Sequence, residues 1–262
     1  MKVRLLFLLL LILFVSTFVS SQPSGANITS FSPSTSNLTS IPGNDSNSYA
    51  GNITSLVVYG NSLTQTWQGY FGNVTGNVQL ADASNYILYN WSSISSQGEV
   101  YSSTNNTISW TNVQCFNFTA NGTISTSGGA ETPGQTNLGG RNLTQLEQQY
   151  GLSPNDGDGV DETFSLGGTL SHNSFFVGNI NFAAGICPST AIFDSTGSSV
   201  DGEFEEVLLY EPATTSLIFA SLMENDLSGF DSNQHDFEML VLDDGHDGDT
   251  DATNYYFYVE IG

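Results

Sequence analysis

Basic residues are almost absent from this sequence. Its 262 residues include three Lys or Arg against 26 Asp or Glu, which gives a formal net charge of −23. Proteins bind nucleic acids and anionic membranes by neutralising phosphates with Lys and Arg. The shortage therefore argues against nucleic acid as a partner and against direct binding to a membrane surface. A surface this acidic suits cations, high salt or colloidal solubility.

The motifs of several common enzyme classes are also absent. The sequence contains no GxSxG, no Walker loop, no GxGxxG and no HExxH. The sequence therefore does not predict a nucleophile elbow, a nucleotide-binding loop or a zinc-protease site. A serine triad stays open in a chain so rich in serine, although no pattern identifies its members. We favour a non-catalytic protein and keep an enzyme as the alternative.

Long apolar runs are confined to the start of the chain. Lys2 and Arg4 precede the apolar residues 5–19, and small residues stand before Gln22. This layout is typical of a secretory signal peptide. Fifteen residues rise only about 22 Å as a helix, short of the roughly 30 Å hydrocarbon core, so a membrane anchor is the less favoured alternative. We predict a signal peptide over residues 1–21 and an extracellular or cell-surface protein.

Cysteine occurs only twice, at Cys115 and Cys187. In an exported chain an isolated pair is most simply a disulfide. Closing a loop of this length would stabilise the fold by roughly 4–5 kcal/mol on the chain-entropy model. The sequence has no CxxC, and a reactive thiol would lack the cationic neighbour that it needs.

Acidic residues and N-x-Ser/Thr sequons lie in different halves of the chain. Of the 26 acids, 22 follow Asn142, whereas no sequon does. We predict that most exposed sequons carry N-linked glycans, the alternative being their chance occurrence in a chain rich in Ser, Thr and Asn. The ten sequon asparagines are Asn27, Asn37, Asn44, Asn52, Asn73, Asn90, Asn105, Asn117, Asn121 and Asn142.

Residues 22–55 and residues 56–262 differ in composition. The first stretch has few apolar residues to offset the entropy of ordering, and we predict a flexible, glycosylated stalk. The second contains short alternating runs rich in aromatic and β-branched residues, which predict an all-β, antiparallel β-sandwich domain. The expected strands are 55–60, 85–91, 98–103, 107–119, 174–180, 190–194, 204–211, 216–222, 237–243 and 254–261.

Three local patterns predict how these elements connect. Residues 207–222 are typical of a hairpin with Pro212 in its turn. The strands 237–243 and 254–261 predict a second hairpin, closed by an acidic loop. The one helix signal covers residues 142–152, with Asn142 as its cap, Gln145 completing a capping-box-like pair and Gly151 closing it.

Two acidic loops are candidate calcium sites, so the expected cofactor is none or calcium. The stretch NDGDGVDE alternates carboxylates around a glycine, as calcium-binding loops do. A true EF-hand is excluded because its last ligand would fall on Ser165; the alternative is a solvated turn that leads into a strand at 162–166. For residues 243–251 we favour the tip of a hairpin, with a weak calcium site as the alternative. The candidate ligands are Asp156, Asp158, Glu162, Asp243, Asp244, Asp247, Asp249 and Asp251.

Histidines and paired carboxylates give weaker signals. A zinc site would combine His235 and His246 with Asp236 or Asp247, but no close histidine pair supports it. Hydrolysis of glycosides needs two carboxyl groups facing each other across a cleft. The period of two along a strand would place neighbouring acids at 205 and 206 on opposite faces. The candidates for such a pair are Glu203, Glu205, Glu206, Glu224, Asp226 and Asp231.

Aromatic residues gather in the first β region. Exposed aromatic rings can stack on sugar rings, whereas buried ones fill the core of a sandwich. We predict that these residues lie in the core. These residues are Trp67, Tyr70, Phe71, Tyr86, Tyr89, Trp91 and Trp110.

Five stretches of this chain together resemble an uncharacterised family of exported archaeal cell-surface proteins. They are residues 67–91, 98–119, 185–193, 204–211 and 237–261. The resemblance covers about residues 66–262 and supports the disulfide, but it implies no activity and no catalytic residue. We therefore expect a structural, adhesive or envelope role, with surface proteins, glycans or further copies of the chain as partners. The alternative is a carbohydrate-binding or glycoside-hydrolysing surface protein.

Overall fold

The computed structural model describes residues 22–34, 47–60, 62–92, 97–118, 143–153, 156–166, 170–243 and 252–262. In these residues the chain is all-β, with antiparallel sheets and two short α-helices. The helices are α2 (Leu143–Gln149) and α3 (Val160–Thr163), and a 3₁₀ turn spans Trp110–Asn112. The strands are β1 (Ser24–Gly25), β2 (Trp67–Gly72), β3 (Asn77–Ala81), β4 (Ile87–Ser92), β5 (Gly98–Ser103), β6 (Gln114–Cys115), β7 (Phe175–Val177), β8 (Ile180–Phe182), β9 (Ser189–Ala191), β10 (Glu205–Glu211), β11 (Ser216–Leu222), β12 (Leu227–Ser228), β13 (Gln234–His235), β14 (Phe237–Leu242) and β15 (Tyr256–Ile261).

The central sheet is built on the β10–β11 hairpin, which confirms the prediction for residues 207–222. Its strands lie in the order β1-β15-β5-β11-β10-β6, and β9 also pairs with β10. The turn is fastened by Glu211, whose carboxylate accepts the backbone N–H groups of Ala213 and Thr214 at 2.9 Å each. Every residue of β10 is buried, so this strand is covered on both faces.

Alternation along β10 divides its side chains between two hydrophobic cores. Val207 and Leu209 enter one core, and Leu208 and Tyr210 enter the other. Successive side chains of a strand point to opposite faces, which is why a central strand reads as a continuous apolar run. The architecture is therefore sandwich-like, with a layer packed on each face of the central sheet.

One face of the central sheet carries the two-stranded β2–β14 sheet together with α2 and α3. Met239 and Val241 of β14 share a core with Phe219 of β11. The ring of Trp67 contacts Phe164 at 5.9 Å and Phe219 at 6.4 Å between ring centroids. The small second sheet thus closes the sandwich on this side.

The opposite face carries the β7–β8 hairpin and the disulfide. The Cys115–Cys187 disulfide is present, with its Cα atoms 4.9 Å apart, and both residues are fully buried. It links β6 to the loop before β9. Trp110 also belongs to this core, where its ring lies 5.0 Å from those of Tyr101 and Tyr258.

Helix α2 confirms the helix predicted over residues 142–152, and its predicted cap Asn142 lies outside the described residues. Gly151 closes it with a positive φ of 70°. Leu152 N–H donates to the carbonyl of Glu147 at 2.9 Å, as in a Schellman motif. The strand expected at 162–166 is wrong: α3 occupies 160–163, and of the remaining residues only Ser165 makes a bridge, to Ser189.

The hairpin predicted from strands 237–243 and 254–261 is wrong. Strand β14 pairs with β2, whereas β15 lies between β1 and β5 in the central sheet. The two strands therefore belong to different layers, and the chain between them crosses from one layer to the other. Each strand has a better-matched partner far away in sequence, which local turn signals do not report.

Other expected strands are divided, reduced or absent. Residues 174–180 contain β7 and the first residue of β8, which pair as a hairpin instead of forming one strand. Residues 55–60 form no strand and are exposed, because nothing pairs with them in the described part of the chain. Within 107–119 only β6 is a strand. There the backbone instead turns at Ser109, whose carbonyl accepts the N–H of Asn112 at 2.9 Å, and this turn directs Trp110 into the core.

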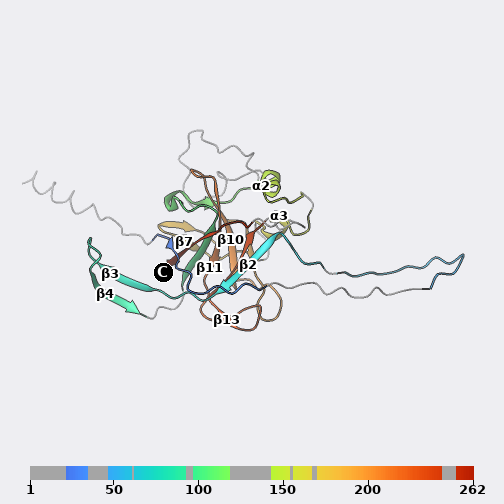
Figure 1. Cartoon of the computed structure of the whole chain (residues 1–262), viewed down its shortest axis with the longest axis horizontal. Coiled ribbons are helices and arrows are strands. Elements are labelled where there is room, and N and C mark those ends of the chain that lie inside the picture. Colours follow the sequence, from blue (N-terminus) through green and yellow to red (C-terminus); the bar gives the residue numbers. More distant parts are fainter. Residues whose placement is uncertain are drawn as a thin grey trace, which may run out of the picture.

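Strands β3 and β4 form a hairpin that stands apart from the central sheet (Figure 1). Residues 52–60 extend from the opposite end of the molecule. Part of the predicted stalk, by contrast, is docked: β1 pairs with β15, and Ala26 N–H donates to the Phe257 carbonyl at 2.9 Å. In the described residues no helix has the length and apolar character needed to cross a membrane.

Candidate functional site

Three carboxylates from two helices meet beside the acidic loop that the sequence predicted. One oxygen each from Glu147 in α2 and from Asp161 and Glu162 in α3 lies within 4.8 Å of the others. Glu147 is only 2% exposed, whereas the other two are exposed. Sequence reasoning identified Glu162 but missed Glu147 and Asp161. Helix α2 brings Glu147 in from another segment, and α3 places Asp161 next to Glu162.

Gly159 allows this cluster to form because the chain passes directly beneath the carboxylates. A Cβ atom at Gly159 would lie 2.5 Å from Glu162 Oε2 and 2.9 Å from Glu147 Oε1. The next residue anchors the buried acid, since Val160 N–H donates to Glu147 Oε1 at 3.3 Å. Any side chain at position 159 would therefore push the two glutamates apart.

The electrostatics of this cluster favour a cation. Burial raises the pKa of Glu147, and the nearby charges of Asp161 and Glu162 raise it further. A side-chain hydrogen bond with Asp161 raises the pKa of Glu162. No lysine or arginine occurs among the described residues to offset the repulsion. Carboxylate oxygens are the ligands that Ca²⁺ prefers.

The other predicted ligands of this loop serve local structure. Asp156 Oδ2 accepts the N–H of Ser153 at 2.7 Å, and Asp158 Oδ2 accepts the hydroxyl of Thr64 at 2.5 Å. Neither residue belongs to the three-carboxylate cluster. The structure thus replaces Asp156 and Asp158 with Glu147 and Asp161 as neighbours of Glu162.

We predict that calcium stabilises this cluster. Millimolar Ca²⁺ should raise the melting temperature by a few degrees over EDTA, the effect of a submillimolar site worth about 1–3 kcal/mol. Glu162→Gln should abolish the shift, because it removes one exposed carboxylate without disturbing the core. Glu203→Gln, outside the cluster, is the matched control. An equal shift in both variants, or an equal effect of magnesium, would contradict a specific site.

Most of the second acidic stretch, residues 243–251, lies outside the described residues, and with it Asp244, Asp247, Asp249 and Asp251. Asp243 is described: its N–H donates to the Thr66 carbonyl at 2.7 Å, which ties the end of β14 to the start of β2. Its Oδ1 atom is buried and accepts no hydrogen bond from the described residues. The calcium hypothesis for this stretch stays a prediction.

The two described residues of the predicted zinc site, His235 and Asp236, do not form a common site. His246 and Asp247 lie outside the described residues. His235 Nε2 lies 2.8 Å from Asp231 Oδ1 rather than beside the carboxylate of Asp236. Asp236 instead accepts the backbone N–H of Val74 at 2.7 Å. His172, the other described histidine, is buried; its Nε2 accepts the N–H of Cys187 at 3.0 Å, and burial lowers its pKa.

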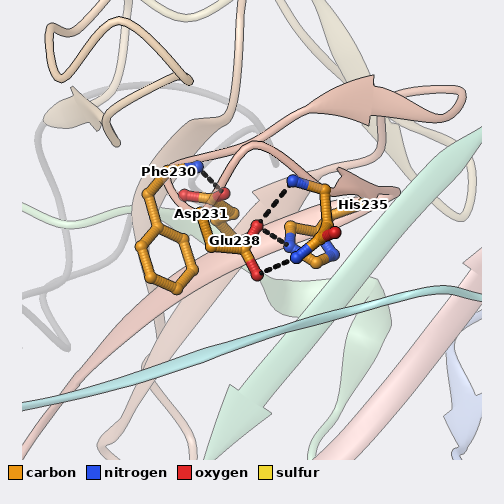
Figure 2. Close-up of polar contacts among 5 residues, drawn as sticks. Phe230, Asp231, His235 and Glu238 are labelled. Atoms are coloured by element: carbon orange, nitrogen blue, oxygen red, sulfur yellow. Dashed lines mark hydrogen bonds and ion pairs between the residues drawn. The ribbon is translucent and has the colours of Figure 1, made fainter.

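Asp231, His235 and Glu238 form a polar cluster between β12–β13 and β14 (Figure 2). Asn233 donates to Asp231 from its side chain at 2.7 Å and from its backbone at 2.9 Å, and these bonds lower the pKa of Asp231 to about 2. Phe230 N–H donates to Glu238 Oε1 at 3.0 Å. The hydrogen bonds fasten the loop to β14, so we interpret this cluster as structural.

Two of the carboxylates proposed for acid–base chemistry line one cleft. The cleft has a volume of about 250 Å³ and lies where β5, β10 and β11 meet the start of β7. Glu205 and Glu224 line it together with Glu99, which the sequence did not single out. Glu206 points to the other face of β10, where its Oε2 accepts Leu240 N–H at 2.8 Å. This confirms the expected separation of Glu205 from Glu206.

The acids of this cleft differ in their surroundings. Backbone N–H groups of Asn173 and Gly202 donate to Glu205 at 2.8 and 3.2 Å. Burial, then the charge of Glu205, raises the pKa of Glu224 to about 7. Burial, then the charge of Glu260, raises the pKa of Glu99 to about 8. Burial also raises the pKa of Glu205, although the two N–H groups oppose the rise. All three carboxyl groups of the cleft therefore have pKa values above the ordinary carboxyl value.

The aromatic residues divide between core and surface, so the prediction of a core role holds for only part of the set. Trp110 is buried, and Trp67 and Tyr70 are half-buried. The rings of Phe71, Tyr86, Tyr89 and Trp91 are exposed. Phe71 lies over His235, and the other three belong to the β3–β4 hairpin and its turn.

The described sequon asparagines lie mainly at the surface. Asn27, Asn52, Asn73 and Asn90 are exposed. Asn105 and Asn117 are half-buried, and the Asn105 side chain donates to Ser216 Oγ at 2.9 Å. Asn37, Asn44, Asn121 and Asn142 lie outside the described residues. Glycan attachment is thus sterically open at the first four sites.

Comparison with known proteins adds no relative to these observations. No protein-family model, no curated protein and no solved structure matches this chain.

Proposed function

We propose that this chain is an exported, acidic, N-glycosylated surface protein with a structural, adhesive or envelope-interaction role. The observation that carries the proposal is its divided surface. Exposed sequon asparagines occupy the N-terminal part, which has few acidic residues, and 22 of the 26 acids follow it. The buried disulfide suits an oxidising compartment. Residues 67–91 and 237–261 resemble exported archaeal surface proteins, and this resemblance agrees with the proposed role.

Fractionation of the cells that produce the protein tests this role. Antibody detection should find the protein in the envelope fraction, with an intact mass above that of the polypeptide because of attached glycans. Washing with EDTA should release part of it if calcium supports its attachment. Recovery of unmodified protein from the cytosol would contradict the proposal.

The carboxylate cleft supports a second candidate function, the hydrolysis of glycosides. Its volume of about 250 Å³ is of the size of a single sugar ring, and Glu205 and Glu224 are its acid–base candidates. Retaining and inverting glycosidases both pair a carboxylic acid with a carboxylate. The protonated state that burial favours at Glu224 would suit the acid, with Glu205 as the base.

Release of reducing sugars from envelope polysaccharides tests this second function. Glu224→Gln and Glu205→Gln should each lower the rate at least about 100-fold, the usual contribution of general acid–base catalysis. Asp82→Asn, on the β3–β4 hairpin and outside the cleft, is the matched control. Equal rates in all three variants, or no release by the native protein, would exclude the cleft as a hydrolytic site.

A further inference from the structure

The β3–β4 hairpin has one apolar face that nothing in the described structure covers. Cross-strand partners share a face, and the register pairs Val78 with Trp91 and Leu80 with Tyr89. The register shifts after Leu80, where Ile87 pairs with Ala81, so Ile87 does not continue this face. The four side chains of Val78, Leu80, Tyr89 and Trp91 are exposed, Tyr89 by 57%. The face is therefore an apolar surface formed by adjacent side chains on both strands.

The other face of the same hairpin is polar. Up to the register shift after Leu80, this face carries the side chains of Asn77, Gln79 and Asn90. Asn90 is a sequon asparagine, so a glycan there would project away from the apolar face. A two-stranded hairpin is marginally stable in water and needs a third strand or a packed face. The hairpin thus has a face available for packing, and within the described residues no third strand pairs with either of its edges.

Residues 53–59 form an extended apolar segment that pairs with no sheet of the described structure. The hairpin has an apolar face without a partner, and residues 53–59 are an apolar extended segment without a partner. The five apolar residues of this segment are exposed, Val57 by 100%. The sequence predicts a strand here because Val and Tyr favour extended backbone. No pairing partner for it exists among the described residues.

A second copy of the chain supplies such a segment, and the charge pattern allows the two elements to meet. No charged residue occurs from 46 to 81, and Asp82 alone interrupts the uncharged stretch up to Gln97. Two copies of a protein with a net charge of −23 repel each other wherever their acidic parts meet. Contact between the segment and the hairpin avoids this repulsion, because apolar side chains meet apolar side chains.

We propose that residues 53–59 of one copy pack as a strand on the apolar β3–β4 hairpin of a second copy. The two elements lie at opposite ends of the molecule, so they do not meet within one chain (Figure 1). A contact between two different surfaces is heterologous and repeats from copy to copy. The chains therefore join head to tail. This inference rests on the proposed structural role and specifies its partner.

Single charges placed on either element test the contact in the full secreted chain. Sedimentation should show that the native protein contains two or more copies per particle at micromolar concentration. Val57→Asp and Tyr89→Asp should each reduce the particle mass at least twofold, to one copy. Both positions are exposed, so the fold is retained, which circular dichroism checks. Ser62→Asp and Gln79→Asp add the same charge beside each element and should leave assembly unchanged.

Mixing the two defective variants distinguishes this geometry from a symmetric one. Val57→Asp keeps an intact hairpin and Tyr89→Asp keeps an intact segment, so their mixture should form particles of two copies and no more. A monomeric mixture would overturn the proposal, as would a monomeric native protein. Assembly by Val57→Asp alone would also overturn it, in favour of a contact between two hairpins.

Failure of this inference is separable from failure of the proposed function. A native protein that is monomeric yet retained in the envelope fraction overturns head-to-tail assembly and leaves the surface role intact. Cytosolic recovery of an unmodified protein overturns the surface role whatever its state of assembly.

Discussion

Replacing both Cys115 and Cys187 with alanine should lower the free energy of unfolding by about 4 kcal/mol. The disulfide closes a loop over a sequence separation of 72 residues, and the chain-entropy model gives a loss of that size. For a chain of this length the melting temperature should fall by about 10 °C. The disulfide also holds β6 and the loop before β9 in one core, so its loss weakens that side of the sandwich first.

Thermal unfolding of the native protein with and without reductant checks this prediction. The native protein under reducing conditions should melt close to the double variant. The double variant should not respond to reductant, which is the internal control. A change of less than about 2 °C on reduction would show that the packing of the two cores, rather than the disulfide, sets the stability.

Stability should rise as the pH is lowered from 8 toward 5. Glu99 lies directly opposite Glu260 in the β5–β15 pair, and both are buried. Burial, then the charge of Glu260, raises the pKa of Glu99 from 4.5 to about 8. A carboxyl whose pKa is higher in the folded chain binds its proton more tightly there. Its contribution is complete below the unfolded pKa and is lost as the pH rises through the folded value.

Glu99→Gln should therefore raise the melting temperature at pH 8 and flatten its pH dependence between 4.5 and 8. The rise in the pKa of Glu99 corresponds to no more than about 5 kcal/mol in the free energy of unfolding, at about 1.4 kcal/mol for each pH unit. Glu260→Gln should change the melting temperature in the same direction, because it removes the charge that opposes Glu99 and a second buried carboxyl whose own pKa is raised by burial. Thermal unfolding of the three proteins across this pH range provides the test. A native protein more stable at pH 8 than at pH 5 would contradict the account.

The sequence predicts elements well where the signal is local. Residues 204–222 carry a continuous apolar run, a proline turn and a second apolar run, and they form the β10–β11 hairpin. Helix α2 follows from the pattern around residues 142–152, with Gly151 as its end. The disulfide follows from the presence of only two cysteines in a chain predicted to be exported.

Pairing between distant strands is not visible in such patterns. Strands β14 and β15 have the composition of a hairpin, yet their partners are β2 and β5. Periodicity specifies which face of a strand is apolar but not which strand lies beside it. The same limit explains residues 55–60, where strand propensity is high and the described structure provides no partner.

Only some residues of the candidate sites could be predicted, because the others come from segments that are distant in the sequence. Glu162 was selected because it lies in an acidic loop, whereas Glu147 comes from α2 and reaches the cluster only through the packing of α2 on α3. Glu205 and Glu224 were selected as acids, but Glu99 completes their cleft from β5. A signal for Glu99 existed, since a charged residue within a buried alternating strand is unusual.

Peptide mapping of the protein purified from its own cells, without reduction, tests the central claim of an exported surface protein most directly. The account predicts an N-terminus at Gln22, a disulfide-linked peptide containing Cys115 and Cys187, and glycan mass on Asn27, Asn52, Asn73 and Asn90. An N-terminus at Met1, with free thiols and unmodified asparagines, would contradict it.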